Sequence, residues 1–110
     1  MTRRRRTCRM RPDVGDAERV GRRLRIHGRV QGVGFRAWAA ENARAGGLVG
    51  WVRNRRDRSV EAVVGGPPGA VEAFVAKCRG GPPAAQVERI DLHDENPASG
   101  DVFSILADGA

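Results

Sequence analysis

The chain has 110 residues, 40% of them hydrophobic, and a formal net charge of +7. This length suits a single domain with one modest core, and the absence of any run of about 18 apolar residues excludes a membrane-spanning helix. The Arg-rich start has no apolar stretch behind it, which excludes a secretory signal peptide, and we expect a cytoplasmic protein.

The basic charge is concentrated near the start of the chain, in a polar segment without hydrophobic period. We expect residues 1–20 to form a disordered basic tail, whose contact with nucleic acid would be nonspecific only. One domain is expected over residues 21–107, followed by a C-terminal end at 108–110. The two cysteines, Cys8 and Cys78, are expected to be reduced thiols rather than a disulfide.

The hydrophobic pattern of the domain predicts five strands and two helices. Strands are expected, in chain order, over about residues 22–30, 48–54, 59–64, 87–92 and 103–105. The first helix ends near Gly46, and the second begins after Pro67 and ends near Gly80. The fourth strand is expected to be irregular between Val87 and Ile90. This order predicts an α+β, ferredoxin-like βαββαβ sandwich, with an antiparallel sheet and two helices on one face.

The segment Gly28–Arg36, with the sequence GRVQGVGFR, connects the first strand to the first helix. Its glycines Gly32 and Gly34 can turn backbone N–H groups into a shared concavity. No Ser, Thr, Asp or Asn caps the start of the helix, and Arg36 places a positive charge at the positive end of the helix dipole. An anion held by these N–H groups and by Arg36 would account for both features, and a plain Gly-rich turn is the alternative.

This segment and the following Gly50–Asn54, with the sequence GWVRN, together resemble the signature pair of the acylphosphatase family. The similarity covers about residues 22–106. The resemblance implies a hydrolase that cleaves the carboxyl-phosphate bond of small acyl phosphates by attack of water. The products would be a carboxylate and inorganic phosphate, and the phosphate would also inhibit. We expect a monomer.

The resemblance also implies roles for several residues of the two motifs. Arg36 would bind the substrate phosphate, and Asn54 would orient the attacking water. The implied phosphate cradle consists of Gln31, Gly32, Val33, Gly34, Phe35 and Arg36. Because the leaving group is a carboxylate, a weak base, the reaction needs no strong general acid. The planar fork of Arg36 can grip two phosphate oxygens, and the Asn54 amide can hold water without being a base.

The acidic residues favour a reaction without a metal ion. Between residues 22 and 60 the sequence contains only the carboxylates Glu41 and Asp57, so we expect no acid–base pair and no magnesium site there. No Cys/His cluster has the spacing of zinc ligands, and we expect neither metal nor cofactor.

Three positions depart from the family pattern. Gly46 stands where relatives usually carry Leu, which should loosen the packing of the helix. Arg58 stands where the hairpin usually has Gly after Asp, which suggests a strained or altered turn. Val102 replaces a usual Gly before the last strand.

Two other functions fit parts of the sequence. An RNA-binding module shares this strand order and a basic charge, but its middle strand carries aromatic residues, and Ser59–Val64 has none. A non-catalytic domain that binds phosphate or carbamoyl phosphate would use the same loop, as in larger maturation proteins that resemble this family at one end. The short chain favours a free-standing enzyme.

Overall fold

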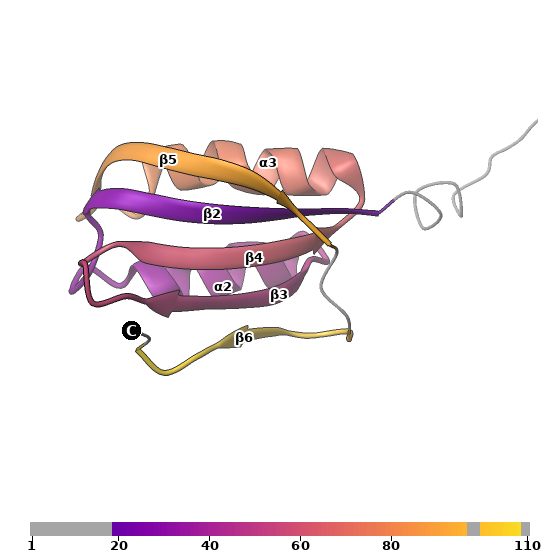
Figure 1. The fold of residues 1–110 in the computed structure, drawn as a ribbon, viewed down its shortest axis with the longest axis horizontal. Coiled ribbons are helices and arrows are strands. Elements are labelled where there is room, and N and C mark those ends of the chain that lie inside the picture. The colour runs from indigo at the N-terminus through magenta and orange to yellow at the C-terminus, as the bar shows by residue number, and fades with distance from the viewer. Residues whose placement is uncertain (1–18, 97–99, 109–110) are drawn as a thin grey trace, which may run out of the picture.

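The computed structural model describes residues 19–96 and 100–108, which form one sheet with two helices packed on one face (Figure 1). In chain order the elements are β2 (Val20–Arg29), α2 (Phe35–Ala45), β3 (Val49–Asn54), β4 (Val60–Gly66), α3 (Pro68–Gly80), β5 (Gln86–Glu95) and β6 (Phe103–Ile105). Every expected element is present, with ends that differ by a few residues. Residues 1–18 of the expected N-terminal tail lie outside the described residues, and so do residues 109–110 of the expected C-terminal end. No helix of the described part is long and apolar enough to cross a membrane.

The sheet has the strand order β5-β2-β4-β3-β6. Its four longer strands pair antiparallel, and both helices lie behind the sheet in Figure 1, as the ferredoxin-like prediction requires. The one difference is that β6 pairs parallel with β3, which makes the sheet mixed rather than purely antiparallel. β5 and β3 run in opposite directions. Because β6 follows β5 and runs back in the direction opposite to it, β6 lies parallel to β3.

The core lies between the sheet and the helices, because alternate strand residues point to that face. Leu24 and Ile26 of β2 are fully buried, and they pair with Ala62 and Val60 of β4. The two helices cover this face with the buried side chains of Phe35, Ala39, Ala40, Ala43, Val71, Phe74, Val75 and Cys78. Packing of α2 on this face brings its N-terminal end to the end of the sheet where β2 and β3 finish.

The irregularity expected between Val87 and Ile90 is confirmed, because the register with β2 shifts there and leaves Glu88 as an extra residue on β5. β5 is an edge strand of the sheet. A bulge in an edge strand increases its twist and hinders pairing with another chain.

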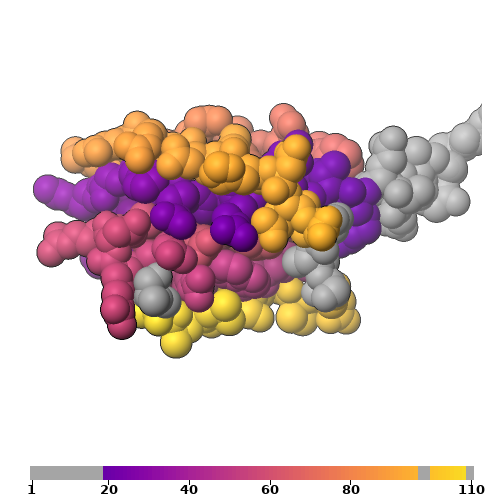
Figure 2. Space-filling view, viewed as in Figure 1, coloured from indigo at the N-terminus to yellow at the C-terminus, as the bar shows by residue number. Residues whose placement is uncertain are grey.

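The sheet face opposite the helices carries a charged cluster around Glu61 of β4. Figure 2 shows this face, with the side chains of β5, β2 and the β3–β4 hairpin side by side. The Glu61 carboxylate is only 3% exposed, and its Oε1 accepts hydrogen bonds from Arg53 Nε at 3.1 Å and Arg55 Nη1 at 2.7 Å. Arg23 lies 3.6 Å from Oε2. Burial alone would raise the pKa of Glu61, but the hydrogen bonds from Arg55 and Arg53 outweigh it and hold the pKa below its usual value.

Candidate active site

The loop between β2 and α2 begins the helix without a side-chain cap. Gly32 and Gly34 have φ angles of 75° and 79°, in the left-handed region that residues with a side chain rarely adopt. A Cβ at either position would meet no atom within 4 Å, so glycine is required by the backbone conformation and not by space. The N–H of Trp38 bonds back to the Gly34 carbonyl at 3.0 Å, so the three helical N–H groups before it have no partner inside the helix. These groups can receive an anion, as the sequence suggested.

A hollow of about 280 Å³ opens beside this loop, at the end of the molecule where β2, β3 and β6 finish and α2 begins (left in Figure 1). Its lining combines residues from three separate segments of the chain: Val30, Gly32, Gly34, Phe35, Arg36, Ala37, Asn54 and Ile105. The fold therefore brings Arg36 and Asn54 to one hollow together with the glycines of the loop. Ile105 was expected only as a residue of a short strand, and no signal in the sequence placed it beside these residues.

The remaining two residues of the expected cradle, Gln31 and Val33, do not line the hollow. Gln31 Nε2 donates hydrogen bonds to the backbone carbonyls of Arg55 at 2.8 Å and Ser59 at 2.9 Å, so its side chain ties the loop to the β3–β4 hairpin. Val33 packs against the hydrophobic core. Both side chains hold the loop in position, and only their backbone groups remain candidates for binding a phosphate.

Asn54 is the last residue of β3 and is 9% exposed. Its Oδ1 is buried and has no hydrogen-bond donor among the described residues. An unpaired buried acceptor costs on the order of 1–3 kcal/mol, so a donor that enters the hollow is favoured. A half turn of the amide exchanges Oδ1 and Nδ2, which lets the side chain offer either an acceptor or a donor to the hollow. This chemistry suits the orientation of a water molecule.

The β3–β4 hairpin contains the strained turn that the sequence suggested. Arg58 has a φ of 75° and is the single described residue other than glycine with a positive φ. The turn closes through the N–H of Arg58 to the Arg55 carbonyl at 3.1 Å and the N–H of Arg55 to the Ser59 carbonyl at 2.9 Å. The hydroxyl and N–H of Ser59 both donate to Asp57 Oδ1, and these bonds lower the pKa of Asp57. These contacts hold the turn that follows Asn54.

Arg36 has an intramolecular partner in the C-terminal segment. Its Nη1 lies 3.0 Å from Oδ1 of Asp108, with 34% of the arginine side chain and 69% of the aspartate side chain exposed. A carboxylate therefore contacts one of the guanidinium donors that a phosphate would use. No pattern in the sequence connects these two residues, which are 72 positions apart in the chain.

Other titratable groups do not gather into a reactive site. Among residues 19–96 and 100–108, no three His, Cys, Asp or Glu side chains lie together in a way that could hold a metal ion. Cys78 is a buried free thiol on α3, and burial raises its pKa to about 12, so it stays protonated and unreactive at neutral pH.

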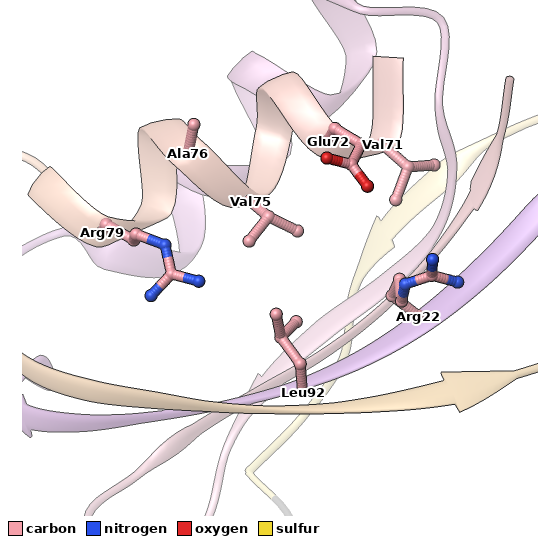
Figure 3. Close-up of a pocket in the computed structure, with 7 residues that line it drawn as sticks. All are labelled: Arg22, Val71, Glu72, Val75, Ala76, Arg79 and Leu92. Carbon is pink, nitrogen blue, oxygen red and sulfur yellow. The ribbon is translucent and has the colours of Figure 1, made fainter. Parts of the chain in front are cut away.

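A second hollow, of about 200 Å³, lies between α3 and the sheet (Figure 3). In Figure 3, Val75 on α3 and Leu92 on β5 point toward each other across it, with Arg22 and Arg79 on opposite sides. None of the residues of the two sequence motifs lines it. The hollow at the loop is therefore the candidate active site.

The chain is similar to several known proteins. A family model described as Acylphosphatase matches residues 22–105. The acylphosphatase of Rhizorhabdus wittichii is 54% identical over 77 residues, which are 70% of this chain and 78% of that protein. The crystal structure of acylphosphatase from Bacillus subtilis matches with a TM-score of 0.75 and 38% identity, over 79% of this chain and 98% of that chain. Full-length HypF, in a phosphate- and nucleotide-bound form, matches over 84% of this chain but only 12% of its own, with a TM-score of 0.77 and 26% identity.

Proposed function

The chain belongs to the acylphosphatase family and hydrolyses acyl phosphates, and we propose that Arg36, Asn54 and the backbone of the β2–α2 loop carry out the reaction. The observation that supports this assignment is the convergence of Arg36, Asn54 and the uncapped start of α2 on one hollow. A cation, fixed N–H dipoles and an amide are the groups that phosphoryl transfer to water requires when the leaving group is already a good one.

In the proposed mechanism, each group has one task. The guanidinium of Arg36 and the loop N–H groups hold the phosphoryl oxygens and stabilise the charge that develops on them. Asn54 orients a water molecule for attack on phosphorus, opposite the acyl oxygen. The P–O bond to the acyl group breaks, the carboxylate leaves with the electron pair, and a phosphate oxygen of the substrate accepts the proton of the water.

The contact between Arg36 and Asp108 gives way to the substrate in this mechanism. An ion pair at this level of exposure contributes at most about 1 kcal/mol, which the several charge-assisted bonds of a bound phosphate exceed. Inorganic phosphate is expected to enter the same cradle and to inhibit competitively.

The roles of Arg36 and Asn54 predict different kinetic defects. Arg36→Ala should raise KM and lower kcat, since it removes the grip on the phosphate in both the ground and the transition state. Arg36→Lys should restore little, because a point charge cannot reproduce the guanidinium fork. Asn54→Ala should leave KM and phosphate inhibition near those of the wild type and lower kcat by about 100-fold. Steady-state hydrolysis of acetyl phosphate, with inorganic phosphate as inhibitor, measures all of these constants.

Matched controls separate the site from general effects. Asn42→Ala removes an asparagine whose Nδ2 bonds to the Trp38 carbonyl within α2, and Arg29→Ala removes an exposed arginine close to the loop. Neither residue lines the hollow, so both variants should retain full kcat. Because the mechanism uses no metal ion, turnover should also persist in a chelator. Wild-type kcat in a folded Asn54→Ala variant would refute the role of Asn54, and purely non-competitive inhibition by phosphate would refute the cradle.

We further propose that the domain over residues 21–107 acts as a monomer in the cytoplasm and that nucleic acid contacts only the basic N-terminal segment, nonspecifically. The buried free thiol of Cys78 is compatible with a reducing compartment. The strongly basic composition of the first residues supports salt-dependent binding to polyanions.

A further inference from the structure

We propose that β6 supplies the acyl-group subsite of this enzyme, with Ile105 as the residue that selects acyl phosphates carrying an apolar acyl group. The inference rests on the proposed function of the hollow at the loop, and it adds the part of the substrate that the phosphate cradle does not contact. Aromatic and branched aliphatic acyl groups are the class that this subsite fits.

The parallel pairing of β6 with β3 determines where Ile105 lies. Ile105 pairs with Val52, two residues before Asn54 on the same face of β3, and the N–H of Leu106 donates to the Val52 carbonyl at 2.9 Å. Phe103, two residues before Ile105, points to the same face and is buried in the core. Ile105 therefore lies on the core side of the sheet, at the end where the hollow opens.

The strand that carries Ile105 is firmly attached. The guanidinium of Arg44, on α2, donates from Nε at 3.1 Å and from Nη2 at 2.8 Å to the carbonyl of Phe103. Together with the bond from Leu106, these contacts fix β6 on both sides of Ile105. Because the backbone on both sides of Ile105 is held in place, its side chain can act as a wall for a ligand without a large loss of conformational freedom.

The hollow is divided into a polar and an apolar part. Arg36, Asn54 and the loop N–H groups form the polar part, whereas the other lining side chains are all apolar. Val30 and Phe35 are almost completely buried and form the floor, but Ile105 is 44% exposed and Ala37 is also exposed. An acyl group beside a bound phosphate would cover this apolar surface, which favours its binding. Among the described residues, Arg36 is the sole charged one that lines the hollow, and the phosphate occupies its guanidinium. A charged acyl group would therefore lose hydration there without gaining a free partner.

The test compares two substrates in the wild type and in three variants. Benzoyl phosphate and acetyl phosphate share the phosphate and differ in apolar area, so the ratio of their kcat/KM values reports on the acyl subsite. Ile105→Ser should lower this ratio by about five- to tenfold, as expected for loss of a half-exposed apolar wall, and should leave competitive inhibition by inorganic phosphate unchanged. Ile105→Val should retain most of the preference. Val102→Ser is the matched control, because Val102 is 63% exposed just before β6 and does not line this hollow.

Each outcome has a distinct meaning. An unchanged ratio in Ile105→Ser, or an equal fall in Val102→Ser, would overturn the acyl subsite while leaving the phosphate site intact. Ile105→Val keeps an apolar side chain at this position, so it should retain the substrate preference. A ratio of kcat/KM values in Ile105→Val as low as in Ile105→Ser would also overturn the proposal. If the wild-type protein hydrolysed neither substrate, the proposed function itself would fail, which is a different result from a lost preference.

Discussion

Replacing Glu61 by Gln should lower the free energy of unfolding by about 2 kcal/mol at pH 7. Removing one partner of a buried ion pair typically costs about 3–5 kcal/mol, since it leaves an uncompensated charge. Here the cost is lower, because the side chains of Arg53 and Arg55 are 31% and 23% exposed and can be partly hydrated. The Gln amide oxygen also still accepts a hydrogen bond. For a domain of this size, 2 kcal/mol corresponds to a fall in Tm of roughly 8–16 °C.

The pH dependence of this effect has a definite sign. The pKa of Glu61 is lower in the folded protein than its usual value of 4.5. The carboxylate therefore contributes its full stability above pH 4.5, and this contribution is lost as the pH falls through the folded-state pKa. The difference in unfolding free energy between the wild type and Glu61→Gln should be largest near pH 7 and should shrink at pH values well below 4.5.

Urea and thermal unfolding at several pH values measure both effects. Glu41→Gln is the matched control, because it makes the same chemical change at an exposed position in the middle of α2 and should alter stability by less than about 0.5 kcal/mol. The reasoning would be refuted if the two variants lost the same stability at pH 7, or if the difference between the wild type and Glu61→Gln stayed constant down to low pH.

Two further substitutions test contacts near the active site. Asp108→Asn should lower the inhibition constant of inorganic phosphate about two- to fivefold, because the exposed carboxylate no longer competes for the Arg36 guanidinium, and a weaker inhibition would instead show that Asp108 positions Arg36. Arg58→Gly should raise the free energy of unfolding by about 0.5–1 kcal/mol, because glycine adopts the left-handed conformation without strain. A loss of stability in thermal unfolding of Arg58→Gly would show that the arginine side chain contributes more than its backbone strain costs.

The sequence by itself determined the local structure of each element and the two motifs that carry the candidate site. The alternation around Leu24 and Ile26 specified which face of β2 is buried, because a strand has a side-chain period of two. The glycines of the loop and the missing helix cap indicated an anion site. Both features depend only on residues close together in the sequence, so they can be recognised without knowing the fold. The turn at Arg58 was also predictable, since the preference for a left-handed conformation is set by residue type and position in the hairpin.

Only the tertiary structure decided how distant segments meet at this site. The parallel pairing of β6 with β3 brings Ile105 to the hollow, and the C-terminal segment brings Asp108 to Arg36. Gln31 belongs to the loop that the sequence predicts as the phosphate cradle, and the structure adds that its side chain is bonded to the hairpin. Hydrophobic period tells which face a residue occupies but not which strand lies beside it. That choice depends on strand order and direction, which follow from the packing of the whole domain.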